Sequence, residues 1–403
     1  MYLTKEEERM LSGEAGPAIE LAMRAIVKVG EAMKAERLVE VAHAHVSGIS
    51  YMNIGEPGRA FIEKLASMGA RVKVFSTVNP IGMDLNRWPE MGIHRDFAEK
   101  QLSIVRSLTQ MGFAPSFTCA PYLLRSPSVG EHLAWGESSA VALANTYYGA
   151  MTNREGGPLA LLCAIAGRTY EAGLHLSENR VPTIELIVPR EISRELSDPG
   201  VAGALGYVVG EKLSGHVPLL RGASRMTFES LRAYTAAAGA TGDIALTIVE
   251  GVTPGWQRAL ASAGRLERVE IEAEEVRGLL RDLDDSIDTI FIGCPHATLE
   301  EIRSVFETLS RRGRAEQPRI VVSTSRQVYE LAESMGFISR ADELGVEIVK
   351  DTCPVVSPMA PRLGAVATTS AKCLFYLPRL HGTKAKLIAW SSLGALNVVA
   401  QKR

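Results

Sequence analysis

Residues 289–353 read TIFIGCPHATLEEIRSVFETLSRRGRAEQPRIVVSTSRQVYELAESMGFISRADELGVEIVKDTC. Short apolar runs, which predict strands, alternate here with segments of helical periodicity; in chain order they are Thr289–Gly293, Leu299–Leu309, Arg319–Ser323, Gln327–Met335 and Val346–Lys350. Strands that alternate with helices favour parallel pairing, because a parallel connection has to cross the sheet. The stretch therefore predicts a β-α-β-α-β unit with helices on both faces of a parallel sheet.

The same alternation continues through the rest of the chain. Thr4 and Glu7 have capping-box spacing at the start of a short helix, and Pro17 opens a longer amphipathic one. Further strands are predicted at Leu38–Val46, Arg71–Phe75 and Ala245–Val249. The predicted fold class is therefore α/β, with largely parallel sheets.

Length and charge limit the possible functions. A chain of 403 residues exceeds one simple core, so we expect an α/β region at 1–200 and another at 201–403, divided where Pro and Gly interrupt the pattern. The formal net charge of -2 gives no attraction to nucleic acid or to an anionic membrane. The charged N-terminus and the lack of an apolar run of about 18–20 residues predict a cytoplasmic protein.

The cysteines fall into two groups. Five are too few and too irregularly spaced for a disulfide framework, and their number is odd. Cys163 and Cys373 lie in apolar helical runs and are predicted to be buried structural residues. Cys119, Cys294 and Cys353 each follow a predicted strand and precede a proline within two residues. Because α/β proteins gather ligand sites at the carboxyl ends of parallel strands, we expect these three thiols to share one site.

Three thiolates leave one coordination position open, as catalytic metal sites do. One interpretation is a [4Fe-4S] cluster whose free iron acts as a Lewis acid on a leaving hydroxyl group. A second is a zinc site completed by His296, and a third is three unrelated structural cysteines. The placement favours the cluster and leaves the other two open.

Residues 135–158, WGESSAVALANTYYGAMTNREGGP, combine small polar residues with a glycine-rich break. Ser138 or Ser139 is predicted to cap a helix whose first N–H groups favour an anionic ligand. The alternative is an ordinary N-cap followed by a tight turn.

Motifs along the whole chain resemble those of the aconitase X family, and within it the branch that dehydrates phosphomevalonate. They are HVSGISY (45–51), NPIGMD (79–84), TCAPY (118–122), GEHLAWGESSAVALAN (130–145), TNREGGP (152–158), GLHLSENR (173–180), EGVTP (250–254), GCPHATLEE (293–301), DTCPVVSPM (351–359) and TTSAKC (368–373). Unlike ordinary aconitases, the chain has no Cys-x-x-Cys pair, so its thiols must come from three separate loops.

The resemblance implies an aconitase-like, multi-domain α/β/α fold and a hydro-lyase. The implied reaction converts (R)-5-phosphomevalonate to trans-anhydromevalonate 5-phosphate in the archaeal mevalonate pathway; the family's alternative substrate is cis-3-hydroxy-L-proline. Cys119, Cys294 and Cys353 would hold an iron–sulfur cluster, [4Fe-4S] or else [3Fe-4S] or [2Fe-2S]. The resemblance also implies a small swivelling-domain subunit with a serine base, since nothing in this chain matches that domain.

Lys372, in TTSAKC, is the predicted source of positive charge for that serine or for an anionic group of the substrate. Ser138 and Ser139 are the other predicted catalytic residues. Residues Asn53–Gly58 are predicted to form a loop. The predicted substrate contacts are Gly55, Glu56, Asn79, Pro80, Asp84, Glu137, Ser138, Ser139, Arg154 and Lys372. For each, the alternative is a structural role as a turn residue, a cap or a salt-bridge partner. The candidate hydrogen-bond donors to these substrate-contacting residues are His45, His175 and His296.

Two other classes of function compete with the hydro-lyase. A nicotinamide-dependent oxidoreductase is compatible with an α/β chain, but no predicted strand is followed by G-x-G-x-x-G at the start of a helix. A non-catalytic metal-binding subunit is compatible with a site that needs a partner.

Overall fold

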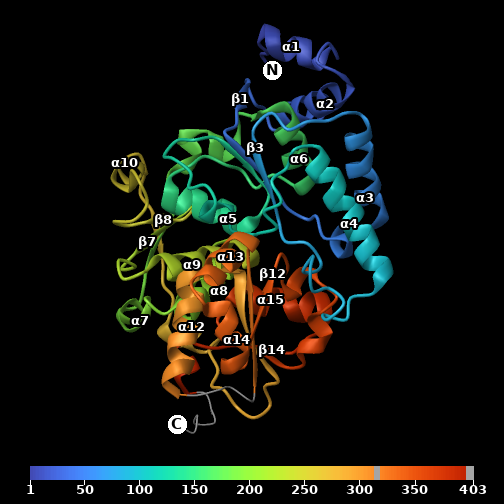
Figure 1. Ribbon diagram of the computed structural model, residues 1–403. Helices are drawn as coiled ribbons and strands as arrows, with labels where there is room; N and C mark the ends of the chain where they lie inside the picture. The colour runs from blue at the N-terminus through green and yellow to red at the C-terminus, as the bar shows by residue number, and fades with distance from the viewer. Residues whose placement is uncertain (313–317, 396–403) are drawn as a thin grey trace.

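The computed structural model describes residues 1–312 and 318–395. It contains three parallel sheets and one two-stranded antiparallel pair, with helices packed around them (Figure 1). The α/β class predicted from the sequence is confirmed. No helix in the described parts of the chain is both long and apolar enough to cross a membrane.

The first parallel sheet has the order β3-β2-β4. Its strands are β2 (His43–Val46), β3 (Phe75–Val78) and β4 (Leu133–Trp135). The helices of this part are α1 (Lys5–Leu11), α2 (Pro17–Ala32), α3 (Tyr51–Ser67), α4 (Arg95–Gln110) and α6 (Gly157–Ala166). The predicted capping box of Thr4 and Glu7 is present at α1, and Pro17 is the first residue of α2. One hydrophobic core joins these helices to the sheet.

The second sheet, of order β8-β7-β6-β9, fills the middle of the chain. It is formed by β6 (Ile184–Ile187), β7 (Pro218–Arg221), β8 (Ile248–Val249) and β9 (Glu267–Val269). The accompanying helices are α7 (Arg190–Glu195), α8 (Pro199–Leu213), α9 (Phe228–Thr241), α10 (Trp256–Ala261) and α11 (Ala273–Arg277). The predicted division after residue 200 falls inside α8.

The third sheet, of order β12-β11-β10-β13-β14, is parallel throughout. Its strands are β10 (Thr289–Ala297), β11 (Arg319–Thr324), β12 (Val346–Lys350), β13 (Val366–Thr368) and β14 (Ala385–Leu387). Its helices are α12 (Leu299–Arg312), α13 (Arg326–Ser334), α14 (Phe337–Leu344) and α15 (Ala371–His381). The predicted β-α-β-α-β unit is confirmed, with its second crossover made of two helices, α13 and α14.

Three predicted strands are wrong in their bounds. The strand at Leu38–Val46 is divided into β1 (Leu38–Glu40) and β2, because the chain changes partner between them: β1 pairs with β5 (Arg168–Tyr170) and β2 with β3 and β4. Residues 71–74 precede β3, since the N–H groups of Val72 and Lys73 donate to the carbonyls of Met111 and Ala164. The strand predicted at 245–249 shrinks to its last two residues, β8.

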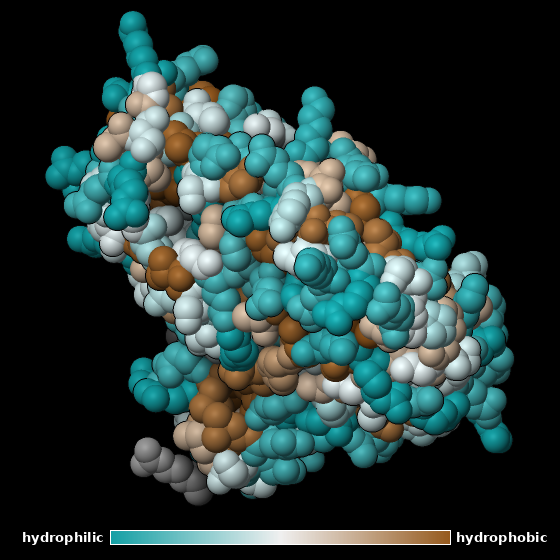
Figure 2. Space-filling model, turned by 90° about the horizontal axis from the view of Figure 1, so that it is seen from above, coloured by the Kyte–Doolittle hydropathy of each residue, from teal (hydrophilic) through white to brown (hydrophobic). Residues whose placement is uncertain are grey.

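The carboxyl ends of the first and third sheets face each other. Contacts between the loops that follow their strands establish this arrangement. The Ile81 N–H donates to the Asp351 carbonyl at 2.9 Å, and Ser50 Oγ donates to the Val356 carbonyl at 2.7 Å. The predicted site loops of both sheets therefore meet inside the molecule. The outer surface, seen from above, is largely hydrophilic, with hydrophobic side chains gathered at the lower left of the view (Figure 2).

Candidate active site

Glu137 and Lys372 form a buried ion pair where the two sheets meet. Glu137 follows β4 and caps α5 (Ser138–Leu143), while Lys372 lies in the first turn of α15. The Lys372 ammonium contacts Glu137 Oε1 and lies 3.2 Å from Ser139 Oγ, which donates to the same carboxylate at 3.0 Å. Only 8 % of the lysine side chain and 12 % of the glutamate side chain are exposed, so water screens this attraction weakly.

Both members of the pair are charged at neutral pH. Burial opposes the charge on Glu137, but Lys372 and the amide of Asn79 outweigh it and lower the pKa of the carboxyl to about 2. Burial also opposes the charge on Lys372, yet Glu137 and the thiols of Cys294 and Cys119 raise the pKa of the ammonium above its usual range. Lys372 is therefore a fixed positive charge beside the thiols rather than a base.

Asn79 completes this group from the neighbouring strand. It follows β3, and its Nδ2 donates to Glu137 Oε2 at 2.7 Å. Its Oδ1 lies 2.7 Å from Nε2 of His45, which belongs to β2. The structure thus brings together four of the predicted site residues, Asn79, Glu137, Ser139 and Lys372, with His45 behind them.

The three segments that carry Cys119, Cys294 and Cys353 meet at His296. The His296 backbone N–H donates to Cys119 Sγ at 3.1 Å, and its ring Nε2 lies 3.0 Å from the carbonyl of Thr352, the neighbour of Cys353. A carbonyl only accepts, so Nε2 carries the ring proton. Because His296 is two residues after Cys294, it links all three segments, and all three thiols are buried.

Two of the three cysteines do not sit where the prediction placed them. Residues 117 and 118 form no strand. They lie beside the end of β3, where the Thr118 N–H donates to the Val78 carbonyl at 3.0 Å. Cys294 lies within β10, in an irregularity between Ile292 and Ala297. Cys353 follows β12, as predicted. All three segments nevertheless meet at the facing edges of the two sheets, and the common site stays a prediction.

The backbone is strained just before each cysteine. Phe117, Gly293 and Asp351 have positive φ angles of 40°, 115° and 68°. A Cβ on Gly293 would lie 2.1 Å from the Ser323 carbonyl oxygen, so only glycine fits there. Asp351 is held by Arg326 through hydrogen bonds of 3.1 and 2.6 Å. Strained conformations persist where packing over-determines them, and they are common at functional sites.

Cys373 lies closer to this site than the sequence predicted. It is buried in α15, as expected, but its thiol hydrogen-bonds to Cys294 and lowers the pKa of that thiol. Ser370 joins the two, because its Oγ donates to the Cys294 carbonyl and accepts from the Cys373 N–H. Cys163, by contrast, is buried within α6 in the core of the first sheet, as predicted.

The donor side chains at this centre are three cysteines and His296. Within residues 1–312 and 318–395, no three Cys, His, Asp or Glu side chains are arranged to hold one metal ion. Nε2 of His296 carries its proton toward the Thr352 carbonyl, whereas Nδ1 is buried and has no hydrogen-bond partner in the described residues, so the zinc alternative stays a prediction. Burial raises the pKa of Cys119 to about 12 and that of Cys353 well above its ordinary value. The thiols of Cys119 and Cys353 are therefore neutral unless metal binds them.

Other predicted residues have structural partners. The α5 cap is Glu137, not Ser138 or Ser139, because its carboxylate accepts from the Ser139 N–H; both serines are buried in the first turn. Asp84 is buried and accepts from the N–H groups of Asn86 and Arg87, which shapes a turn. Pro80 is buried beside Asn79.

The remaining predicted contacts lie nearer the surface. The segment expected to be a loop at residues 53–58 is part of α3, which is kinked at Gly55, where φ is 54°. Glu56 is exposed and paired with Arg59 and the Tyr51 hydroxyl. Arg154 lies beside Trp135 at the end of β4 and pairs with Asp243, with 40 % of its side chain exposed.

Sequence reasoning missed Arg232 of α9. This buried side chain donates to the Tyr122 hydroxyl at 2.9 Å, to Glu301 at 3.0 Å and to the His296 carbonyl at 2.7 Å. It thereby supports the loop that links the cysteines. The signal was an arginine inside the alanine-rich helix LRAYTAAAGA, since a buried charge must find partners.

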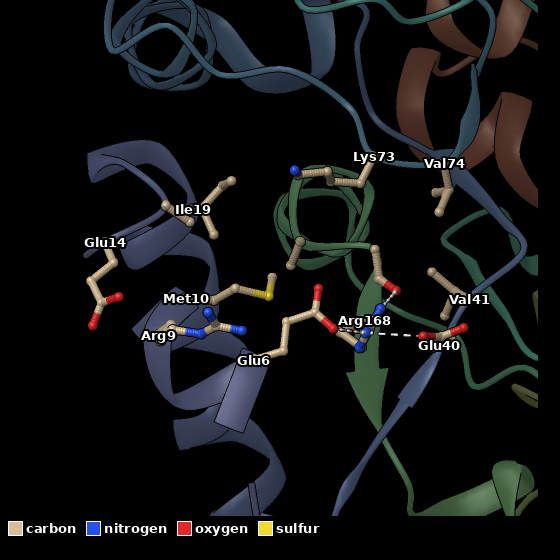
Figure 3. A pocket seen from close by; sticks show the side chains of 13 residues that line it. Glu6, Arg9, Met10, Glu14, Ile19, Glu40, Val41, Lys73, Val74 and Arg168 are labelled. Carbon is tan, nitrogen blue, oxygen red and sulfur yellow. Dashed lines mark hydrogen bonds and ion pairs between the residues drawn. The ribbon is translucent and has the colours of Figure 1, made fainter. Parts of the chain in front are cut away.

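A separate hollow of about 560 Å³ lies between α1, α2 and the end of α6 (Figure 3). Arg168 projects into it and pairs with Glu6, Glu7 and Glu40. None of the predicted site residues lines this hollow. Arg168 therefore has a structural role, holding the N-terminal helix against the β1–β5 pair.

The fold and the site define an α/β protein with an enzyme-type centre, in which a buried lysine–carboxylate pair lies beside three thiols. Models of the first, second and third domains of aconitase X match residues 1–178, 179–281 and 287–395. The chain belongs to the aconitase X family. These models divide the chain into three parts, whereas the sequence predicted two.

Relatives of known name agree with this membership. "Phosphomevalonate dehydratase large subunit" of Methanothermobacter thermautotrophicus is 40% identical over 98% of both chains, and that of Thermococcus kodakarensis is 39% identical over 93% of this chain and 95% of its own. "Cis-3-hydroxy-L-proline dehydratase" of Pseudomonas aeruginosa is 34% identical over 94% of this chain and 67% of its own. The crystal structure of Thermococcus kodakaraensis aconitase X in its holo-form has a TM-score of 0.90 and 36% identity, and the match covers 98% of this chain and 100% of that one.

Proposed function

We propose that this chain is the large, catalytic subunit of a hydro-lyase that converts (R)-5-phosphomevalonate to trans-anhydromevalonate 5-phosphate. The phosphomevalonate dehydratase subunits match it at 38–40% identity over nearly their whole length. The hydroxyproline dehydratases are less similar, and this chain spans about two thirds of their length. The dehydratase names of these relatives leave no support for a nicotinamide-dependent oxidoreductase.

The observation that carries the proposal is the meeting of the Glu137–Lys372 pair with the thiols of Cys119, Cys294 and Cys353. These thiols would hold an iron–sulfur cluster, [4Fe-4S] in our proposal, because they come from three separate segments and would leave one iron of such a cluster without a protein ligand. A bound cluster supplies a Lewis acid for the hydroxyl group that leaves.

Lys372 has the central role in binding the substrate. Its ammonium is already charged and buried, so it can hold a carboxylate or phosphate with no change of protonation. Ser139 Oγ accepts from this ammonium at 3.2 Å and donates to Glu137, which holds the lysine in place, and Ser138 lies next to it in α5. Arg154 is the proposed phosphate fork, because it is half-exposed and its exposed partner Asp243 can be exchanged.

The base comes from elsewhere. Glu137, with a pKa of about 2, is too weak a base to remove a proton from carbon at neutral pH. We assign that step to a serine on a small swivelling-domain subunit, whose alkoxide Lys372 would stabilise. Gly55, Glu56, Pro80 and Asp84 remain predictions for the shape of the substrate pocket.

Anaerobic co-expression with the small subunit, followed by a dehydration assay, tests this function. We expect the complex to form trans-anhydromevalonate 5-phosphate from (R)-5-phosphomevalonate, and Lys372→Met to lower kcat/KM at least about 100-fold. Lys350→Met, which removes a lysine outside this site, is the matched control. A complex that binds iron and sulfide but leaves phosphomevalonate unchanged would contradict the proposal.

A further inference from the structure

A chain of buried hydrogen bonds runs from Glu137 back into the first sheet. Asn79 Nδ2 contacts Glu137 Oε2, and Asn79 Oδ1 contacts His45 Nε2, both at 2.7 Å. His45 Nδ1 lies 2.7 Å from Thr77 Oγ1, which lies 2.8 Å from His43 Nε2. The parallel register of β2 and β3 places Thr77 directly opposite His45. The sequence named His45 only as a candidate donor, and the proposed reaction uses none of His43, His45 and Thr77.

The charge on Glu137 determines the direction of every bond in this chain. A carboxylate only accepts, so Asn79 must donate its amide N–H and present its oxygen to His45. His45 then carries its proton on Nε2 and leaves Nδ1 as an acceptor for the Thr77 hydroxyl. The Thr77 oxygen in turn accepts from His43 Nε2. His43 Nδ1 has no partner in the described part of the chain, which is where the chain of bonds ends.

Both histidines are suited to a neutral relay. Burial lowers the pKa of His45 to about 4, and burial also lowers the pKa of His43 well below its ordinary value. The rings pack against Trp135, with centroid distances of 5.3 Å for His43 and 6.2 Å for His45. Neutral rings in this pocket have two possible tautomers, and the hydrogen bonds select one of them.

We propose that His45 is a positioning residue for the dehydration: held in its Nε2–H tautomer by Thr77, it orients Asn79, which fixes Glu137 and so aims the Lys372 ammonium at the substrate. This inference rests on the proposed function for its kinetic consequence only. The relay moves no proton along its length, because the Asn79 amide interrupts it. The relay matters because Lys372 has to keep one position while the substrate's anion and Glu137 compete for hydrogen bonds from the lysine ammonium.

The substitution Glu137→Gln gives a test that needs no activity. Lys372 is only a donor, so it takes the Gln carbonyl oxygen, and the Gln amide NH2 then faces Asn79. Asn79 must turn its oxygen toward that NH2 and its own NH2 toward His45. His45 then has to accept at Nε2 and carry its proton on Nδ1. One uncharged substitution is therefore expected to reverse the tautomer of a histidine that it does not touch.

The measurement is ring ¹⁵N NMR on the full-length chain labelled in its histidines, with His45 assigned from the signal lost in His45→Asn. We expect the Nε2–H tautomer in the wild-type chain and the Nδ1–H tautomer in Glu137→Gln. The same tautomer in both proteins would overturn the relay. If the tautomer switches as expected but the wild-type complex does not dehydrate phosphomevalonate, the relay stands and the proposed function is refuted.

A kinetic pair tests the role of the relay in turnover. Thr77→Val keeps the shape of the side chain but removes the hydroxyl, whereas Thr77→Ser retains it. With the reconstituted complex, we expect kcat to fall about 10- to 100-fold in Thr77→Val with KM changed less than about threefold, and Thr77→Ser to stay within about threefold of wild type. Equal kcat values in Thr77→Val and Thr77→Ser would overturn the positioning role. This kinetic test remains available if Glu137→Gln does not fold.

Discussion

At the scale of single residues, Glu137 does most to organise the site. One carboxylate accepts from Asn79, Ser139 and Lys372, which lie on three different elements. The ion pair of Glu137 and Lys372 is costly to desolvate, and that cost is offset only while both charges and their hydrogen bonds are present. Removing either partner would leave an uncompensated charge in a dry site.

This dependence predicts how stability changes with pH. The pKa of Glu137 is lowered from 4.5 to about 2 by folding, so the unfolded chain binds the proton more tightly. The contribution of this group to the free energy of unfolding, roughly 3 kcal/mol, is fully present above about pH 5 and is lost as pH falls toward 2. Urea unfolding from pH 6 to pH 3 should show the stability gap between wild type and Glu137→Gln shrinking. A gap that stays constant over that range would contradict the pairing.

The cysteines give a second prediction at this scale. Cys119→Ser, Cys294→Ser and Cys353→Ser should each reduce iron and sulfide to background after anaerobic reconstitution, because each thiol comes from a different segment of the chain and a serine hydroxyl does not replace it. Cys163→Ala and Cys373→Ala are the matched controls and should retain the cluster. A full iron and sulfide content in any serine variant would remove that cysteine from the ligand set.

At the scale of elements, the close crossing of α8 and α9 supports the side of the site formed by α5 and α15. Glycines make the crossing possible: a Cβ on Gly206 would lie 2.2 Å from the Tyr234 carbonyl oxygen. Gly239 of α9 lies against the Ser138 carbonyl, and Gly203 of α8 against Ala371, so the crossing adjoins both helices that carry the ion pair. A change in this packing would therefore displace both Glu137 and Lys372.

Gly206→Ala should therefore lower the free energy of unfolding by about 2–3 kcal/mol, since the methyl group has no space and backbone must move. Gly264→Ala, at an exposed position where a Cβ meets nothing within 4 Å, is the control and should change it by less than about 0.5 kcal/mol. Chemical denaturation of both variants makes the comparison. Equal stabilities would show that the helices can separate without cost.

At the scale of the whole molecule, two parallel sheets point their carboxyl ends at one shared centre. The proposal assigns the proton acceptor to a second subunit, so the isolated chain is expected to fold and to lack dehydratase activity. Adding the small subunit should raise turnover by at least about 100-fold, as the gain from a general base. Circular dichroism confirms folding, and turnover is measured with and without the partner. Comparable turnover by the large chain alone would contradict this division of labour.

Substrate choice is also a property of the assembled site. A site built for a phosphate leaves its donors unpaired when the phosphate is missing, which costs several kcal/mol, or about a thousandfold in kcat/KM. Unphosphorylated mevalonate should therefore be a very poor substrate and cis-3-hydroxy-L-proline should not react. We would compare kcat/KM for the three compounds with the reconstituted complex. Mevalonate within tenfold of the phosphorylated compound would rule out a phosphate site of this kind.

Local patterns were enough to predict much of the fold. The alternation of apolar runs and helical periodicity in residues 289–353 predicted the order of β10, α12, β11 and β12, because burial on both faces of a parallel sheet leaves that pattern in any sequence. The capping box at Thr4 and the proline at residue 17 predicted helix starts for equally local reasons. Strand ends were predicted less well, since the partner of each N–H group lies far away in the chain, as with Lys73 and Ala164.

By itself, the sequence determined the fold class and the family resemblance, and it predicted a common site for three cysteines, because each is recorded in residue types and short spacings. Only the tertiary structure decided which polar residues meet. Asn79, Glu137 and Lys372 are separated by 58 and 235 positions and contact one another because two sheets face each other. Cys373 approaches Cys294 and Arg232 reaches His296 for the same reason. Contacts across such distances depend on how the sheets pack, and no local pattern in the chain records that packing.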